Sequence, residues 1–502
     1  MFQKALNGKC RVLVLLCVGQ IWVQTNAGTQ KVSQESEQPR CAKLILPDKL
    51  KEDLDFLFKT IAEVHPNMYA YTSKEEFELL RQQLYAQMSH PMNRLEFYKI
   101  TAPVVAALKN SHTALRPFLQ EYIRHLEDGG KVFPLGVTWN GSKVIVSNNY
   151  SSTPLLMEGE VLTINGQSAS EMFMTFSRLW AAEARSTNPW FAKNLHLVRC
   201  LLLLEFGPVE SWDLKIRSND GKVSSYTIKS VAATELEGQE AKTLASNSYQ
   251  YLPEYNTSLL KIRSFGGDLE KFREFLRESF QQIRKQKVAS LIIDVRENAG
   301  GGDHLVNSLM EYLTAKPYRL YEKTEIKISV QSRDIIEHIR RKVPDKFANK
   351  KEGDIVILEI PLRTPSTNPF RFTGRIFVLI GSQTFSASTV FASTVKCFHV
   401  GTLVGEETPD PPTLYASCVL SRLPNSELDL GVASKYMVAA CGKPDGRGVI
   451  PDYEVKQKPQ DTAKGVDTVL QFTLNLVKES NSKSLGKQIL EDLHTSQPQG
   501  QK

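Results

Sequence analysis

A serine at a predicted strand-to-helix junction is the first residue in this 502-residue sequence whose setting suits chemistry. The β-branched and aromatic run Ile376–Ile380 stops at Gly381, and after Ala387 the apolar residues recur at helical spacing. This pattern predicts a buried strand, a turn and a helix, with Ser386 at or just before the first helical turn. Unpaired N–H groups and the positive end of the helix dipole stabilise a developing oxyanion there, so Ser386 is a candidate nucleophile.

A serine at the start of a helix is more often only a cap, so the junction needs support from other residues. Two further stretches supply it: Ser111–Thr113 in the first quarter of the chain, and the glycine-rich run Asp294–Asp303 at the end of a predicted strand. A serine hydroxyl needs a base to be nucleophilic at neutral pH. Among the nine histidines His112 is the best candidate, and His304, beside the glycine run, is the alternative.

Three stretches of the chain together resemble the C-terminal-processing (tail-specific) serine peptidases. They are, in the family's order, Asp294-x-Arg296-x-Asn298-x-Gly300-Gly301, Ser386-Ala387-Ser388 and Gly446-x-Gly448-Val-Ile-Pro451-Asp452. The resemblance covers residues 45–460. It implies an α/β core of the crotonase-like ββα type, an N-terminal helical domain, an inserted PDZ-like β domain, and hydrolysis of polypeptides without a cofactor.

Two branches of this family differ in the residue that serves as the catalytic base. Usual members employ a lysine beyond the nucleophile, but here Pro411 stands in that place and no lysine lies between Lys396 and Lys435. The sequence is therefore similar to the tricorn-like branch, whose base is a histidine supported by a serine and an acid. Carried over to this chain, the resemblance implies Ser386 as nucleophile, His112 as base, Ser111 as its supporting hydroxyl and Asp445 as the acid.

The acid has substitutes. Family members often have glutamate in the place of Asp445, so Glu406 and Glu407 are alternatives, although a solvated loop pair is the simpler interpretation of both. Asp452, which follows Pro451, is expected to fix a turn.

The glycine run is expected to complete the site. The N–H of Ala387 and one N–H of Gly300–Gly301 would form the oxyanion hole, because glycine lets the backbone approach the substrate closely. The polar residues of Asp294–Asn298 would hold this loop in place. Ser388 would point around the helix and away from the attacked carbonyl, which favours Ser386 as the nucleophile.

The elements that must position these residues form three predicted domains. Three amphipathic helices between Asp48 and Lys109, broken at the two His-Pro pairs, make a helical domain over residues 45–118. Short strands and an Asn165-Gly166 turn make the PDZ-like domain over 130–232, with a helical insertion at 168–205; whether its groove binds a peptide C-terminus stays open. Alternating strands and helices predict a mostly parallel sheet in the catalytic core over 250–475, after a linker at 232–250 and before a polar tail at 476–502.

The first 27 residues read as a signal peptide, because a basic start precedes an apolar run over Val12–Val23 and small residues follow it. That run is short for a bilayer span, so we expect a secreted or periplasmic protein without stable membrane insertion. The leader carries three basic residues, so its removal lowers the net charge of the chain from +7 to +4 (7 − 3). A charge of +4 is too weak to indicate nucleic-acid binding.

Cysteine and metal-ligand spacing set further limits. Seven cysteines, less Cys10 and Cys17 of the leader, leave five, so at most two disulfides form and at least one thiol stays unpaired within the chain. No His-Glu-x-x-His or paired cysteine–histidine spacing occurs, so no metal site is expected. Asn140, Asn149 and Asn256 would be glycosylation acceptors in a eukaryotic host.

Two functions follow from these residues. The first is a secreted serine endopeptidase that forms an acyl-enzyme on Ser386. The second is a non-catalytic binding protein, since the same core occurs in a retinoid-binding protein of the eye; the missing lysine and Thr389, where the family often has glutamate, favour it. Ser386, Ser111–His112 and the glycine run in one chain argue against it. The sequence leaves open a gated site, the substrate and the oligomeric state.

Overall fold

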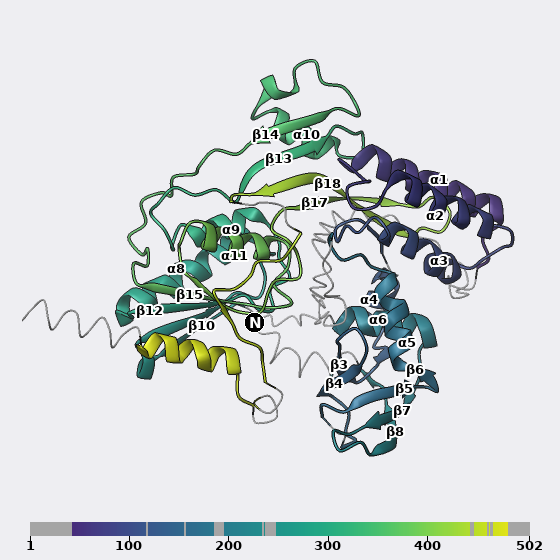
Figure 1. The fold of residues 1–502 in the computed structure, drawn as a ribbon, viewed down its shortest axis with the longest axis horizontal. Helices are drawn as coiled ribbons and strands as arrows, with labels where there is room; N and C mark the ends of the chain where they lie inside the picture. Colours follow the sequence, from purple (N-terminus) through teal and green to yellow (C-terminus); the bar gives the residue numbers. More distant parts are fainter. Residues whose placement is uncertain are drawn as a thin grey trace, which may run out of the picture.

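A six-stranded sheet forms the centre of the C-terminal half of the protein (Figure 1). The structure is a computed structural model that describes residues 43–116, 119–154, 157–184, 195–232, 235, 247–441, 446–458, 461 and 465–479. The strand order is β10 (Ser248–Leu252), β11 (Thr257–Lys261), β12 (Ser290–Asp294), β15 (Arg375–Ile380), β16 (Thr402–Gly405) and β19 (Tyr453–Glu454). All pairs except β10–β11 are parallel, as the alternating strands and helices predict.

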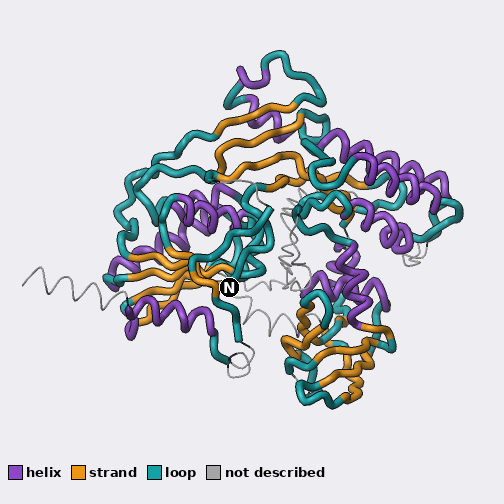
Figure 2. The backbone as a smooth tube through the Cα atoms, viewed as in Figure 1, coloured by secondary structure: helices purple, strands orange, loops and turns teal. Residues whose placement is uncertain are grey.

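Helices cover both faces of this sheet (Figure 2). On one face, α8 (Leu269–Gln286), α9 (Asp303–Met310) and α11 (Ala387–Cys397) share a core with the buried side chains of Leu260, Ile293 and Val378. On the other face, helical residues 468–479 pack against Leu259, Ile292 and Leu379. Alternate strand residues therefore face two cores, which explains why these strands are continuous apolar runs.

A second sheet, which the sequence analysis did not anticipate, joins the two halves of the chain. Its order is β1 (Ala114–Leu115), β18 (Asp429–Ala439), β13 (Tyr321–Lys327) and β14 (Ile355–Glu359), and β17 (Leu414–Arg422) also pairs with β18. β1 follows the Ser111–Thr113 stretch directly, and its Ala114 pairs with Gly431. This pairing brings the predicted base next to the catalytic core.

The N-terminal helices match the sequence prediction. They are α1 (Pro47–Val64), α2 (Lys74–Gln87) and α3 (Arg94–Ala106). The Asn93 side chain accepts hydrogen bonds from the Leu95 and Glu96 N–H groups, and the Glu96 carboxylate reaches back to the Asn93 N–H. This capping box fixes the start of the helix that leads to His112.

The region predicted to be PDZ-like contains an antiparallel sheet and helices that pack against it. The sheet comprises β3 (Leu135–Trp139), β4 (Val144–Asn149), β5 (Glu160–Ile164), β6 (Gln167–Ser168), β7 (Ser211–Arg217) and β8 (Val223–Lys229). The predicted turn is present, with positive φ at both Asn165 and Gly166. The predicted insertion includes α5 (Ala169–Arg178) and α6 (Leu195–Phe206), while α4 (Leu119–Glu127) and the pair β2 (Lys131–Val132) and β9 (Val231–Ala232) connect this region to its neighbours.

The linker predicted over 232–250 needs a correction at its end. Residues from Ser248 belong to β10, because their N–H and C=O groups pair antiparallel with β11 at the edge of the main sheet. The signal peptide and most of the polar tail lie outside the described residues. Within the described ranges, no helix combines the length and apolar character needed to cross a membrane.

A disulfide between Cys397 and Cys441 ties the end of α11 to the residues after β18. Cys200 and Cys418 are free thiols, and Cys41 lies outside the described residues. Because the bridge closes a loop of 44 residues, we expect Cys397→Ser with Cys441→Ser to lower the free energy of unfolding by about 4 kcal/mol. Urea unfolding with and without dithiothreitol measures this loss. An unchanged midpoint in the double variant would contradict it.

Candidate active site

Ser386 lies at a strained turn between β15 and α11. Its backbone has φ 54° and ψ −123°, a conformation that non-glycine residues adopt rarely and mostly at functional sites. Thr384 holds the turn: its Oγ1 accepts from the Gly381 N–H and donates to the Val295 carbonyl, at 2.9 Å each. Thr389 Oγ1 donates to the Thr384 carbonyl at 2.8 Å, so this atypical residue helps to fix the turn. The Ser386 side chain makes no capping hydrogen bond, which removes the simple cap as its explanation.

His112 contacts Ser386 from the opposite part of the chain. The distance from His112 Nε2 to Ser386 Oγ is 3.3 Å, although 274 residues separate them in sequence. The β1–β18 pairing and the Phe385 ring position the imidazole, which stacks on that ring at 5.4 Å with an interplanar angle of 14°. Both site residues are buried, with 4% of each exposed. The structure thus brings together the predicted nucleophile and the predicted base.

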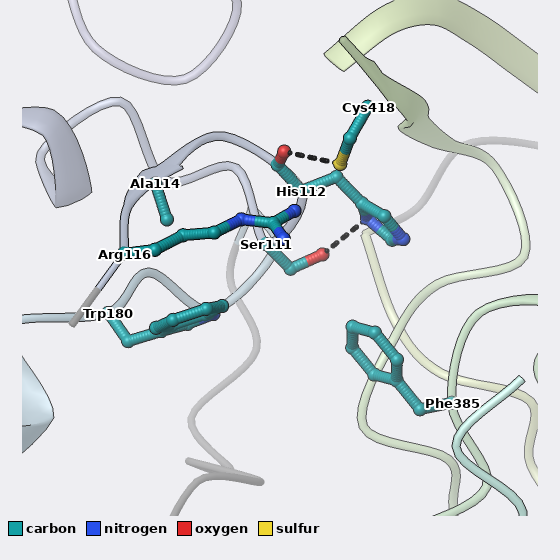
Figure 3. Close-up of a pocket in the computed structure, with 7 residues that line it drawn as sticks. All are labelled: Ser111, His112, Ala114, Arg116, Trp180, Phe385 and Cys418. Atoms are coloured by element: carbon teal, nitrogen blue, oxygen red, sulfur yellow. Dashed lines mark hydrogen bonds between the residues drawn. The ribbon is translucent and has the colours of Figure 1, made fainter. Parts of the chain in front are cut away.

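Ser111 extends the contact on the far side of the imidazole (Figure 3). Its Oγ lies 3.0 Å from His112 Nδ1 and donates to Glu183 Oε2 at 3.0 Å. Since the Ser111 hydroxyl hydrogen is used in the bond to Glu183, Nδ1 must be the protonated ring nitrogen. Nε2 is then unprotonated and able to accept the Ser386 proton.

Glu183 is the acid that the sequence analysis missed. It is fully buried, and its Oε2 also accepts hydrogen bonds from the Ser111 N–H at 2.7 Å and from Asn110 Nδ2 at 2.8 Å. The segment that carries it is fixed by the bond from the Ala184 N–H to the Lys109 carbonyl. No local motif marks Glu183, because it follows α5 in the inserted region and reaches the site only through the fold.

Burial controls the ionisation of this acid and of the base. Burial raises the pKa of Glu183 to about 7, and the hydrogen bonds from Ser111, Tyr415 and Asn110 oppose that rise. Burial lowers the pKa of His112 to about 4, and the positive charge of Arg116 adds to the effect. His112 is therefore neutral at physiological pH, as a general base must be.

A second buried carboxyl, Asp410, flanks the same serines. Burial and the negative charge of Glu183 raise the pKa of Asp410 well above its usual range, and hydrogen bonds from the Ser111 hydroxyl and the Ser386 N–H oppose the rise. Two carboxylates this close cannot both ionise easily. Asp410 directly precedes Pro411, where the sequence analysis looked for a lysine.

The glycine run packs against the nucleophile. Asn298 connects the two: its Oδ1 accepts from the Gly300 N–H at 2.9 Å, and its carbonyl accepts from the Phe385 N–H at 3.0 Å. A Cβ on Gly300 would lie 2.8 Å from the Ser386 Cβ and 3.0 Å from the Ala387 nitrogen. Gly300 is therefore needed for space. Its N–H is not available as an oxyanion donor, because Asn298 accepts it, which leaves Gly301 as the candidate.

The sequence around this site is similar to that of a known peptidase family. Residues 256–455 match the model of Peptidase family S41. These residues belong to that family. The predicted relationship and the class of enzyme, a serine-type peptidase, are confirmed at this level.

The fold of the whole chain is similar to that of CPAF. The structure of mature CPAF complexed with lactacystin is 16% identical, with a TM-score of 0.57, and the match covers 88% of this chain and 99% of that chain. A mutant of CPAF is 14% identical, with a TM-score of 0.61, and covers 86% and 97% respectively. At these identities the likeness shows the fold alone. No curated protein matches the chain in sequence.

The remaining predicted residues of the S41 core have other surroundings. Glu407 accepts from Arg447 and from the Gly448 N–H, so it fixes a loop. Asp452 accepts from the Leu403 N–H at 2.8 Å, which agrees with a structural role. His304 is exposed on α9, and no hydrogen bond of the described residues joins it to Ser386, whereas Asp445 lies outside the described residues. In the described parts, no cluster of His, Cys, Asp and Glu side chains could hold a metal.

The polar residues of the Asp294–Asn298 loop hold it as predicted. Arg296 bonds the Asp294 carboxylate at 2.8 Å and the Asp467 carboxylate at 2.6 Å. Asn298 Nδ2 donates to the Ile262 carbonyl at 3.0 Å. These bonds position the glycine run without contacting Ser386.

We expect Gly300→Ala to lower kcat by about 10²-fold or more, because the new methyl group would displace the Ser386 turn and the Ala387 N–H. Gly267→Ala is the matched control: its φ of 101° equals that of Gly300 within a degree, but nothing lies within 4 Å of the added Cβ. Both variants carry the same backbone strain, so only the first should lose activity. Equal kcat values in a peptide-hydrolysis assay would contradict the crowding argument.

Proposed function

We propose that this chain is a secreted serine endopeptidase that hydrolyses peptide bonds of polypeptide substrates through an acyl-enzyme on Ser386. The observation that carries the proposal is the continuous contact from Ser386 Oγ to His112, Ser111 and Glu183, in which each polar atom has a partner of the right kind. A nucleophile, a base and an acid that orients the base define this class of site by geometry.

In the acylation step, His112 Nε2 takes the proton of the Ser386 hydroxyl while Oγ attacks the carbonyl carbon of the substrate. The imidazolium that forms is stabilised through Ser111 by the Glu183 carboxylate. His112 then gives the proton to the leaving amine. Water enters, loses a proton to His112 and attacks the acyl carbon. The bond to Ser386 Oγ then breaks, and His112 gives its proton to Oγ, which restores both residues and releases the second product.

The oxyanion of each tetrahedral intermediate needs two donors. Ala387 is the first residue of α11, where helical N–H groups have no partner within the helix. Gly301 supplies the second in our proposal. The bridge between Phe265 and Gly301 is made by the Gly300 carbonyl and the Gly302 N–H, and it fixes Gly301 next to Gly300, which packs against Ser386.

The acid role in this mechanism passes from Asp445 to Glu183. Glu183 has the contacts with Ser111 that the role requires, and it is buried, so its charge acts at low dielectric. Secretion is supported by the leader-like N-terminus and by the Cys397–Cys441 disulfide, since disulfides persist in oxidising compartments. The PDZ-like assignment of the inserted region and the crotonase-like assignment of the core remain parts of this proposal.

The non-catalytic binding protein is the weaker hypothesis. A carrier has no need for a strained Ser386 whose hydroxyl contacts a neutral histidine. Maintaining such backbone strain costs about 1–3 kcal/mol, which favours a function for it.

Purified protein incubated with a diverse library of unmodified peptides tests the proposal. We expect new peptide termini, detected by mass spectrometry, and the same products in the presence of EDTA, because no metal takes part. Unchanged peptides over a range from pH 5 to 9 would overturn the peptidase proposal. Products that disappear with EDTA would show a contaminating metallopeptidase instead.

A further inference from the structure

Arg116 is a buried cation in a small pocket beside the catalytic histidine (Figure 3). Only 6% of the residue is exposed. The pocket is lined by Ser111, His112, Ala114, Arg116, Trp180, Phe385 and Cys418. Figure 3 shows the Arg116 side chain extending above Ser111 toward His112, with the Trp180 ring below it. One positive charge therefore lies in the same pocket as the base His112, its supporting Ser111 and Phe385, the residue before the nucleophile.

No carboxylate of the described residues forms an ion pair with Arg116. Two other buried or half-buried arginines have such partners: Arg94 pairs with Glu121, and Arg296 pairs with two aspartates. The two acids of the active site, Glu183 and Asp410, bond the serines and their neighbours instead. The Arg116 main-chain N–H donates to the Asp429 carbonyl, and its side chain packs on Gly431 and contacts the Cys418 thiol.

A buried cation without a counter-charge is costly, so proteins pair such groups with an anion. Since the chain supplies none to Arg116 among the described residues, the counter-charge is expected from a ligand. A guanidinium presents a planar fork of N–H donors that matches a carboxylate in two parallel hydrogen bonds. The aromatic rings of Trp180 and Phe385 form apolar walls of this pocket.

We propose that the Arg116 pocket binds a carboxylate of the substrate and makes the enzyme selective for anionic peptides. This inference rests on the proposed function and names the substrate class of the same site. The carboxylate can come from an acidic side chain next to the cleaved bond or from the C-terminal α-carboxylate of a short peptide. Both sources share the chemistry that Arg116 recognises.

Carboxylate binding would also act on catalysis. The charge of Arg116 helps to depress the pKa of His112. A bound carboxylate neutralises that charge and so strengthens His112 as a base while the matching substrate is in place. Anionic substrates should therefore have a higher kcat as well as a lower KM than neutral ones.

Matched peptide pairs test the inference, first by binding. Calorimetry on the Ser386→Ala protein compares a peptide with Glu before the cleaved bond with its Gln counterpart, and a free C-terminus with its amide. We expect about 10- to 100-fold tighter binding of the charged member of one pair, as for a charge-assisted hydrogen bond. Arg116→Gln in the same background should remove the difference, and Arg116→Lys should keep part of it. The pair that responds identifies the source of the carboxylate.

The cleavage assay then separates this inference from the proposed function. In the otherwise unaltered protein, kcat/KM should show the same charge preference, and Arg116→Gln should abolish it while the neutral peptide is still cut. Equal binding of charged and neutral peptides, or a preference that survives Arg116→Gln, overturns the pocket assignment. Arg116-dependent binding without any cleavage supports the pocket and overturns the peptidase proposal.

Discussion

Ser386→Ala is expected to lower kcat for peptide hydrolysis by about 10⁶-fold, the loss typical of a serine peptidase that loses its nucleophile. The Ser386 Oγ is the atom that His112 Nε2 contacts at 3.3 Å, and no other hydroxyl of the described residues bonds this nitrogen. The alanine side chain removes one oxygen atom, and the strained turn is held by Thr384 and Thr389, so the fold should persist.

Ser388→Ala is the matched control for this variant. Ser388 is fully buried on α11, two residues from the nucleophile, and its Oγ has no hydrogen-bond partner in the described structure. Removing an unsatisfied buried hydroxyl costs little. We expect kcat within a few-fold of the unaltered protein. Activity that depends on Ser388 and survives Ser386→Ala would reverse the assignment.

Glu183→Gln is the second prediction, with an expected loss of about 10²–10⁴-fold in kcat. Replacing the acid of a Ser-His-Asp triad by its amide lowers kcat by about 10⁴, and here the acid acts through Ser111, which softens the effect. The amide can still accept the Ser111 hydrogen bonds, but it carries no charge to stabilise the His112 imidazolium. Glu407→Gln, which alters one of the alternative acids of the sequence analysis, is the control and should keep its activity.

The ionisation of Glu183 also predicts how kcat/KM and stability change with pH. The folded-state pKa of Glu183 is about 7, raised from the ordinary 4.5 by burial. The carboxylate forms only as pH rises through 7, so kcat/KM should rise over that range, and Glu183→Gln should remove the rise. The same shift lowers stability: the contribution of neutral Glu183 is complete below pH 4.5 and is lost as pH rises through 7.

Thermal melting across pH completes this test. The unaltered protein should lose stability between pH 4.5 and 7, and Glu183→Gln should lose less. If Glu183 only supported the fold, Glu183→Gln would instead reduce both the thermal stability and the activity of the protein. If the pH–rate profile of Glu183→Gln keeps its rise near 7, another group controls the rate, and Asp410 would be the next candidate.

The predictable part of this structure is the part with local signals. The capped helix α8 begins after Asp268, whose side chain accepts from the Lys271 N–H, and the Asn165–Gly166 turn has the positive φ angles that its residue types favour. The buried strands β12 and β15 are continuous apolar runs. In each case the sequence pattern and the tertiary environment favour the same conformation.

The parts that sequence could not predict depend on long-range pairing. β1 has only two residues, so nothing local marks it as the partner of β18. Glu183 is one charged residue among many, and its role comes from Ser111, 72 residues away. His65, at the first of the two His-Pro breaks, lies in the loop after α1, and no local pattern marks its buried contact with Tyr415, at 4.6 Å between rings.

The most direct measurement is labelling of the folded protein with a serine-reactive fluorophosphonate, followed by mass-spectrometric mapping of the modified peptide. The account predicts a single adduct, on Ser386, that forms faster as pH rises through 7 and is lost in His112→Ala. A folded protein that gives no adduct on Ser386 at any pH between 5 and 9, or gives one on Ser388, would contradict it.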